Sequence, residues 1–578
     1  MEFPVRSRLL GYAEATRQGT GVFWLRLKKW FLAASIVGVL VGLAVTAVHW
    51  LVYEVLWGAV SQYAMTPWGT LLFPTIGLAL SGFILQRFTK DPNLHGTEEV
   101  IEVFHHNRGV FDYRSAPGKV MAAVATLGFG GSAGLEGPSI YIGGVVGSYV
   151  MRKSKRLGFD ENDVRTLMIA GSAAGVAAIF KAPLTGIIFA LEVPYMDDMT
   201  REALIPSLVA SVSAYLVLVA FLGVSPLFYV AQRYTMAPSD LGWAIVLGVV
   251  VGLLARIFIA SFKRVSRLSR ESGLPLWVRT GLGGLVVGLL GLVGHLLYGK
   301  PMVLGTGYDL VQGLVGGSFT TSEAFWLLIL KTGAIVATLG SGAAGGVFIP
   351  MIVLGASAGS LMGGLLPAGS PAALFPVVGM AAFLAAGYNT PLAAAAFIAE
   401  STGGSGYLIP GLVGAAVAYA IAGKTSISTS QRWRRESRLD RMLGIRVSDI
   451  MTRDVIGVPQ DITLRDFVSD YVVRLRHKSF PVLDGKKLVG IIGLSDVNRF
   501  TSDERGVVLV SEVMARDVAT ALPGDTVRRV VELMTEGDFD RVPIVEAEGS
   551  DRIAGVVSST DIVKLDGILE PARGAITS

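Results

Sequence analysis

The chain has 578 residues, of which 52% are hydrophobic and 16% are charged, and its formal net charge is +5. Average globular chains carry roughly 25% charged residues, so the composition excludes an ordinary soluble protein for most of the chain. Basic clusters beside apolar runs indicate membrane topology rather than nucleic-acid binding. Cysteine is absent, which excludes disulfides and Cys-ligated metals, and the six histidines form no zinc motif.

The N-terminal segment, residues 1–29, is polar and basic, and its first 20 residues lack the apolar core of a signal peptide. Apolar runs dominate residues 30–430, where we expect roughly 10 to 14 spanning segments, some of them short or interrupted by glycine. A second basic cluster, RWRRESR at 432–438, follows the last run. By the positive-inside rule we predict that both termini are cytoplasmic, in the plasma (inner) membrane of a prokaryote.

The apolar region contains an internal duplication. Gly-rich segments begin at residues 131 and 340, and the related motifs KAPLTGIIFALE and NTPLAAAAFIAE begin at 181 and 389, so the two offsets are 209 and 208 residues. Gly-rich breaks at matching places in the two halves of a transporter mark a site near the bilayer midplane. Irregular backbone at that depth must be buried in protein or line a cavity. The pattern therefore predicts a site for a small ion in these segments.

Glu136 lies inside the first Gly-rich segment and is the candidate gate. Backbone N–H groups at helix N-termini bind an anion without a full opposing charge, and glycine permits the close approach. An ionisable residue at membrane depth is a functional candidate. The Glu136 carboxylate can compete with an anion for the same donors, and its protonation would open the path. The alternative is a fixed carboxylate that stabilises the loop.

These motifs resemble the CLC family of chloride channels and proton–chloride exchangers over residues 30–430. GLEGP at 134–138 matches the family's Gly-x-Glu-Gly-Pro loop, and GGVFIP at 345–350 matches its Gly-x-Phe-x-Pro loop. The resemblance implies a polytopic α-helical membrane fold with inverted-repeat halves and broken, Gly-rich helices. The halves would cover about 30–225 and 240–430. It also implies a homodimer in the lipid bilayer that transports chloride or another small anion.

On this resemblance, the residues expected to surround the anion are His95, Gly96, Leu135, Gly137, Val347, Phe348, Ile427 and Ser428. Phe348 matches the residue whose N–H contacts the central anion and whose ring forms a constriction, with a core aromatic as the alternative. His95 replaces a coordinating serine and either donates to an anion or bonds nearby backbone. Leu135 replaces the usual arginine. The family's tyrosine is absent, and either Ile427 or Ser428 takes its place, so the physiological anion stays open.

Proton coupling is the second point at which the sequence departs from the family. Val193 stands where many exchangers carry a proton-transferring glutamate, and valine cannot titrate. Glu192 and its repeat counterpart Glu400 occupy matching positions, which favours buried carboxylates satisfied by backbone N–H groups. A proton-pathway role for Glu192 is the alternative. We therefore expect a passive channel, with a proton-coupled exchanger on the same scaffold as the second candidate.

The C-terminal part is charged and globular, and it follows a basic linker at 431–446. VSDIMTRDV at 447 recurs as VSEVMARDV at 510, and each copy is followed by a helical stretch and two short strands. These residues resemble a pair of CBS modules, at 447–505 and 510–570. The resemblance implies an α+β pair packed with pseudo-symmetry.

Nucleotide binding by the tail is predicted from one complete signature. The family pattern of Gly, two apolar residues, Ser or Thr, two residues and Asp runs from Gly555 to Asp561, whereas Gly493 replaces the hydroxyl in the first copy. We expect one adenine nucleotide (ATP, ADP or AMP), with the Asp561 carboxylate on the ribose beside Ser558 and Thr560. The alternative is a structural pair in which Asp561 caps the following helix. No other cofactor is expected.

Functions of other classes find less support in the sequence. An intramembrane metalloprotease with CBS modules needs His-Glu-x-x-His, and the sequence lacks that motif. A serine enzyme is not supported, because GGSGY at 403–407 has no evident histidine partner. A CBS-regulated cation transporter would want several carboxylates in the membrane part. The sequence therefore predicts a transporter without enzymatic activity.

Overall fold

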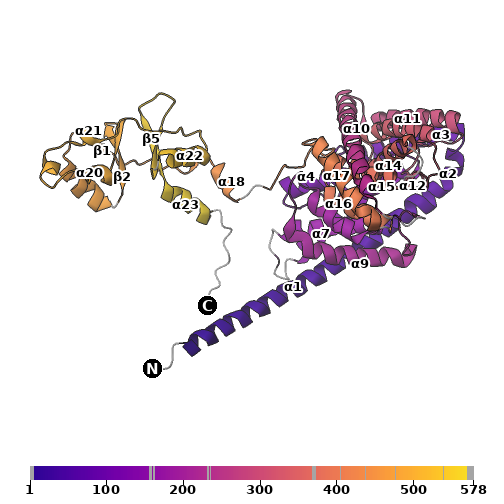
Figure 1. Ribbon diagram of the computed structural model, residues 1–578, viewed down its shortest axis with the longest axis horizontal. Helices are drawn as coiled ribbons and strands as arrows, with labels where there is room; N and C mark the ends of the chain where they lie inside the picture. The colour runs from indigo at the N-terminus through magenta and orange to yellow at the C-terminus, as the bar shows by residue number, and fades with distance from the viewer. Residues whose placement is uncertain are drawn as a thin grey trace. The chain divides into compact units, whose positions relative to one another are not determined.

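The computed structural model describes residues 5–154, 159, 163–230, 234, 236–366, 373–403, 405–435, 438–475, 477–537 and 539–568. Contacts divide the chain into two compact units, the membrane unit Met1–Arg435 and the tail unit Glu436–Ser578. The membrane unit is helical, and the tail unit contains the strands (Figure 1).

The first half of the membrane unit contains α1 Val5–Trp50, η1 Leu51–Trp57, α2 Gly58–Ala64, α3 Pro67–Phe88, α4 Gly96–His106, α5 Ala116–Gly128, α6 Glu136–Lys153, α7 Asp163–Phe180, α8 Pro183–Glu192, η3 Arg201–Ala203 and α9 Leu204–Leu222. The second half contains α10 Pro238–Glu271, α11 Leu276–Tyr298, α12 Tyr308–Val315, α13 Thr321–Gly340, α14 Phe348–Leu365, α15 Leu374–Tyr388, α16 Pro391–Ser401, η4 Ser405–Tyr407 and α17 Leu408–Ala422. Helices α3 and α11 lie side by side, which joins the two halves (Figure 1).

Helix length separates two groups within the described part of the membrane unit. Eight helical segments are long and apolar enough to cross a bilayer, and four apolar helices, α8, α15, α16 and α17, have 10–17 residues. The expected 10 to 14 spanning segments therefore include helices that are too short to span the hydrocarbon core alone. A full span needs about 20 residues, so the short helices do not cross the hydrocarbon core alone. Helix α15 is buried throughout, whereas α8, α16 and α17 each expose large apolar side chains, among them Leu184, Leu392 and Ile409.

Glycine lets equivalent helix pairs approach closely in both halves. Gly143 of α6 faces Gly171 of α7, and Gly355 of α14 faces Gly379 of α15, and in each pair an added Cβ would collide with the partner's carbonyl oxygen. Small residues at such crossings allow helix backbones to touch inside a membrane. The duplication in the sequence thus appears in the structure as two equivalent helix–helix contacts.

Two carboxylates tie the halves together reciprocally. Glu192, the last residue of α8, accepts a hydrogen bond from Ala393 N in the first turn of α16, at 2.9 Å. Glu400, near the end of α16, accepts from the Thr185 backbone N–H and hydroxyl in the first turn of α8, at 2.7 Å each. A carboxylate at a helix N-terminus satisfies free N–H groups and complements the helix dipole. These are the backbone contacts that the sequence analysis expects for both residues.

After α17 the chain runs through residues 425–435, a segment that we call the strap. Gln431 is buried in it and donates to Val193 O and Tyr388 O, both at 2.8 Å. Further along, Met196 N donates to Arg432 O at 2.9 Å. The strap is therefore fastened to the ends of α8 and α15.

The tail unit contains α18 Arg438–Leu443, η5 Val447–Asp449, β1 Val458–Pro459, α19 Leu464–Asp466, η6 Phe467–Val473, β2 Ser479–Asp484, β3 Lys487–Gly493, α20 Leu494–Val497, η7 Glu504–Gly506, α21 Val510–Val513, α22 Val527–Gly537, β4 Arg541–Val545, β5 Ile553–Ser558 and α23 Ser559–Ile568. Strands β1, β2 and β3 form one sheet, and β4 and β5 form another. The antiparallel pairs β2–β3 and β4–β5 occupy the two stretches where the sequence predicts paired strands.

The two copies in the tail exchange their leading segments. Thr452, which follows the first copy's opening motif, bridges to Val556 in β5 of the second copy, and Ala515 bridges to Ile491 in β3 of the first. Val447 correspondingly belongs to the hydrophobic core of the second copy. This exchange buries an apolar face of each copy, so neither copy has a complete core alone.

The reciprocal caps yield a stability prediction. Replacing Glu400 by Ala leaves the first-turn donors of α8 unpaired, so the free energy of unfolding should fall by roughly 1–3 kcal/mol. Glu202→Ala is the control, because Glu202 pairs with Arg435 where both side chains are about half exposed. Such surface pairs contribute about 0–1 kcal/mol. Thermal unfolding in detergent should show a clearly larger decrease for Glu400→Ala, and equal decreases would contradict the capping role.

Candidate functional site

The two Gly-rich loops meet at the centre of the membrane unit. Gly134 and Gly346 exchange two backbone hydrogen bonds, Gly134 N to Gly346 O at 2.8 Å and Gly346 N to Gly134 O at 2.7 Å. A Cβ on either glycine would collide with the Glu136 carboxylate. The loops therefore need glycine at both positions, and their contact brings the first turns of α6 and α14 together.

Glu136 begins α6, but its carboxylate binds the start of α14. Its Oε1 atom accepts hydrogen bonds from Phe348 N at 2.5 Å and Ile349 N at 3.3 Å. The side chain is 1% exposed, and its Oε2 atom has no hydrogen-bond partner among the described residues. Backbone donors at a helix N-terminus are an anion-binding arrangement, and here the Glu136 carboxylate occupies it.

Phe348 contributes both its backbone and its ring. Its N–H group binds Glu136, and its ring packs against Phe180, Phe189 and Phe397 at centroid distances of 4.5, 5.2 and 5.1 Å. The ring is fully buried in this aromatic cluster. The cluster fixes the first turn of α14 beside Glu136.

A third helix N-terminus reaches the same place. Helix α4 begins at Gly96, whose φ of +64° favours glycine, and His95 precedes it in extended conformation without capping the helix. A Cβ on Gly96 would lie 3.5 Å from Gly345 O and 3.7 Å from Gly137 Cα. The starts of α4, α6 and α14 therefore converge. This brings together the three segments that contain the predicted residues His95, Gly137 and Phe348.

The strap lies beside the three converging helix starts. Ile427 and Ser428 are 8% and 3% exposed, and Ile427 N donates to Gly387 O at 2.9 Å. Both residues line a cavity of about 440 Å³ together with His95 and Val347. Leu135, which precedes α6, is buried in the hydrophobic core and does not line this cavity.

Tyr388 lines the site but is not among the residues that the sequence predicts. It ends α15, is 4% exposed and lines the same cavity, and its ring packs against Phe189 at 5.3 Å. A buried tyrosine therefore stands beside the strap positions where the family's tyrosine is lacking. Its location immediately before the second copy of the duplicated motif is the signal that could have identified it.

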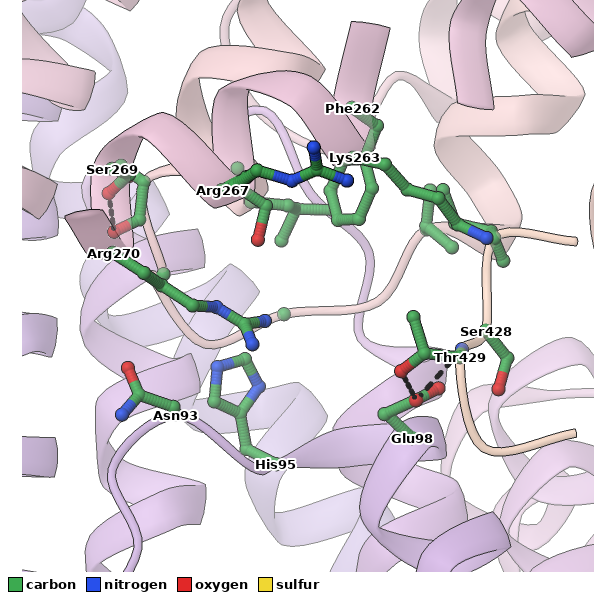
Figure 2. A pocket seen from close by; sticks show the side chains of 18 of the residues that line it. Asn93, His95, Glu98, Phe262, Lys263, Arg267, Ser269, Arg270, Ser428 and Thr429 are labelled. Carbon is green, nitrogen blue, oxygen red and sulfur yellow. Dashed lines mark hydrogen bonds between the residues drawn. The ribbon is translucent and has the colours of Figure 1, made fainter. Parts of the chain in front are cut away.

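A carboxylate on α4 holds the strap in place. Glu98 Oε1 accepts from Thr429 N at 2.9 Å, Thr429 Oγ1 at 2.6 Å, Ser430 N at 3.0 Å and Ser430 Oγ at 2.9 Å. Figure 2 shows Glu98 and Thr429 joined at one side of the cavity. This contact links the start of α4, and hence His95, to the segment that continues into the tail.

Two buried cations were also missed. Lys119 forms an ion pair with Glu99 of α4 at 2.6 Å, and both side chains are almost completely buried. Lys331 is fully buried in α13 and donates to Val303 O at 2.9 Å and Gly305 O at 2.8 Å. Local sequence gives little signal for either, because the partners come from other elements.

The predicted tail residues lie at the start of α23. Asp561 Oδ2 accepts from Ser558 N at 2.9 Å and Ser558 Oγ at 2.7 Å, and Thr560 is exposed. In the first copy, Asp496 accepts from Gly493 N at 2.8 Å in the same way. Both aspartates therefore make the capping contact that is the alternative to nucleotide binding.

Comparison with known families agrees with this architecture. The family model described as voltage gated chloride channel matches residues 76–423, more than half of the chain, and the CBS domain model matches 447–503 and 510–567.

Among curated relatives, the voltage-gated ClC-type chloride channel ClcB of Escherichia coli O81 is 32% identical over 419 residues, covering 68% of this chain and 95% of the relative. The H(+)/Cl(-) exchange transporter ClcA of Cronobacter sakazakii is 30% identical over 403 residues, covering 66% and 84%.

Solved structures show the same fold. A CLC-type fluoride/proton antiporter superposes with a TM-score of 0.61 at 24% identity, covering 71% of this chain and 98% of that chain. A eukaryotic CLC transporter superposes with a TM-score of 0.59 at 19% identity, covering 93% and 98%. The predicted polytopic helical membrane fold with a C-terminal CBS pair is confirmed. The chain belongs to the CLC family of voltage gated chloride channels, and its tail carries two CBS domains.

Proposed function

We propose that this membrane protein transports chloride or another small anion passively, with Glu136 as the gate. The observation that carries the proposal is the Glu136 carboxylate bound to the N–H groups of Phe348 and Ile349. A carboxylate and a permeant anion cannot hold the same donors together. Protonation removes the charge that binds Glu136 there, which frees the donors for the anion.

The proposal of a channel rather than an exchanger rests on two residues at the C-terminal end of α8. Val193 cannot carry a proton, and the neighbouring Glu192 carboxylate already accepts hydrogen bonds from Leu392 N and Ala393 N. Both oxygens of Glu192 accept a backbone hydrogen bond, whereas Oε2 of Glu136 accepts none among the described residues, so Glu192 has no free oxygen on which to carry a proton. Relatives carry both names, the channel ClcB and the exchanger ClcA, so family membership alone does not separate the two functions.

The membrane orientation and the assembly belong to the same proposal. Basic residues cluster at the end of α10 and in the strap that leads to the tail, which supports a cytoplasmic location for this side and for both termini. Helices α9 and α17 carry exposed apolar side chains, including Leu208, Leu216 and Ile409. These faces are available to lipid and to a second copy, in keeping with a homodimer.

For the tail, we propose one adenine nucleotide at the start of α23. Both bonds of Asp561 with Ser558 go to Oδ2, and within the described residues no hydrogen bond reaches Oδ1. The carboxylate can thus cap the helix and still accept ribose hydroxyl groups. Nucleotide would regulate transport only through different affinities for two states of the protein.

Glu136→Gln tests the gate. The amide stays neutral at every pH, so anion flux should be constitutive and change by less than about twofold where carboxyl groups titrate, roughly pH 4 to 7. Flux from liposomes is measured at several pH values, with Glu102→Gln on α4 as the control. If Glu136→Gln keeps the pH dependence of the parent protein, Glu136 is not the gate.

Proton coupling is tested with the purified parent protein in liposomes under a chloride gradient. Because Val193 cannot titrate, we expect anion efflux without stoichiometric proton movement. Anion and proton fluxes are recorded together. Uphill proton movement would contradict the channel and establish the exchanger, and loss of that movement in Glu192→Gln would then identify Glu192 as a proton carrier.

Nucleotide binding is tested by calorimetry on the full-length protein with ATP, ADP and AMP. We expect one nucleotide per chain, and Asp561→Ala should weaken binding by at least about tenfold because charge-assisted bonds to ribose are lost. Asp496→Ala is the matched control, since Asp496 makes the equivalent cap in the first copy. Absence of binding by the parent protein would leave the tail a structural pair, and two nucleotides per chain would show that Gly493 is no obstacle.

A further inference from the structure

The cavity beside the convergent helix starts is much larger than a small anion requires. Its volume of about 440 Å³ lies within the range of sites for small organic molecules, roughly 300–1,000 Å³. It is lined from α4, the end of α10, the start of α11 and the strap. We call it the basic vestibule, because its wall includes Lys263, Arg267, Arg270 and Arg279.

Three of these cations face the vestibule from one side of α10. Lys263, Arg267 and Arg270 are spaced four and three residues apart, which places them on one helix face. Figure 2 shows them along the vestibule, with the guanidinium of Arg270 directed toward His95. Arg264 is the next residue after Lys263 and, unlike the three cations, does not line the cavity. The cavity lining therefore takes the basic residues of one face of α10 and excludes Arg264.

The three cations on α10 do not form ion pairs with the described carboxylates around them. In the part of the chain that the structure describes, no ion pair is formed by Lys263, Arg267 or Arg270. Two carboxylates line the same cavity. The Oε1 atom of Glu98 already accepts four hydrogen bonds from the strap, and Glu271 forms no ion pair with these cations among the described residues. The wall therefore carries four basic and two acidic side chains, which is an excess of positive charge beside His95.

Arg279 completes the wall in a fixed orientation. Its terminal nitrogens donate to Ser269 O at 3.1 Å and to Asn93 Oδ1 at 3.3 Å. Its Nε atom is buried and has no hydrogen-bond partner among the described residues. A guanidinium that is held by neutral groups keeps its full charge for a ligand.

We propose that the basic vestibule binds a phosphate-type oxyanion, free or borne by a lipid headgroup, and that the bound oxyanion blocks the anion path at His95. Guanidinium groups match phosphate oxygens with paired, charge-assisted hydrogen bonds, and several cations together favour a multivalent ligand. A passing halide needs neither this geometry nor this volume. The site is separate from the tail and adds a direct form of inhibition to the proposed transport.

The test uses full-length protein in detergent and inorganic tripolyphosphate, which has no ribose, as the probe. Calorimetry should show binding in the Asp561→Ala background, and added chloride should weaken it by competition. The double variant Arg267→Gln/Arg270→Gln should bind at least about tenfold more weakly. The single variants Arg267→Gln and Arg264→Gln form a matched pair, because each removes one positive charge from the same helix, inside and outside the vestibule. Arg267→Gln should weaken binding, and Arg264→Gln should stay within about twofold of the parent.

A second arm assigns the source of the phosphate. Anion flux is measured in phosphatidylcholine liposomes with tripolyphosphate on both sides, and in liposomes that contain phosphatidylinositol 4-phosphate. Inhibition by tripolyphosphate assigns a soluble ligand, and inhibition by the lipid alone assigns a headgroup. Either inhibition should be lost in the double variant, whose thermal unfolding is compared with that of the parent protein.

Two results would overturn the proposal. One is the absence of any effect of tripolyphosphate and phosphoinositide on a parent protein that conducts anions in the same liposomes. The other is an equal loss of binding in Arg264→Gln and in Arg267→Gln, which would show only general attraction to a basic surface. Binding by a protein without anion flux would instead overturn the proposed function and leave the vestibule site standing.

Discussion

The contact on which the structure depends joins the first turns of α6 and α14. The carboxylate of Glu136 lies on the N–H groups of Phe348 and Ile349, while Gly134 and Gly346 hold the two loops together beneath it. Charge stabilisation at a helix N-terminus is strong enough to bind and weak enough to exchange, because it comes from dipoles rather than from a full cation. In the proposed function, the gate and the anion site are therefore two uses of one set of donors.

The duplicated fold makes this contact possible. Pairs of glycines let α6 pack on α7 and α14 on α15, and Glu192 and Glu400 cap helices of the opposite half. Each half thus supplies polar groups that the other half needs in a medium without water. Short helices such as α8 persist because their free N–H groups are satisfied across the duplication, and only then can the Gly-rich loops stay at membrane depth.

Much of this was predictable from the sequence, and the reasons for the remainder are physical. The Gly-rich loops, Glu136 and the paired strands of the tail carry local motifs, and the matching offsets reveal the reciprocal carboxylates. Tyr388 only adjoins a motif and Arg270 has none, because both reach the site only when the ends of α15 and α10 fold against α4 and the strap. The positive-inside rule alone explains basic residues at the end of α10, so the sequence offers no reason to expect them in the wall of a cavity.

The strap connects these features to the rest of the chain, since Glu98 binds it beside His95 and Gln431 binds it to the ends of α8 and α15. The most direct test of shared donors is a crystal structure of Glu136→Gln grown with bromide, located by anomalous scattering. We predict a bromide peak within hydrogen-bond distance of Phe348 N and Ile349 N. Bromide bound elsewhere, with those two N–H groups unoccupied by it, would contradict the shared site.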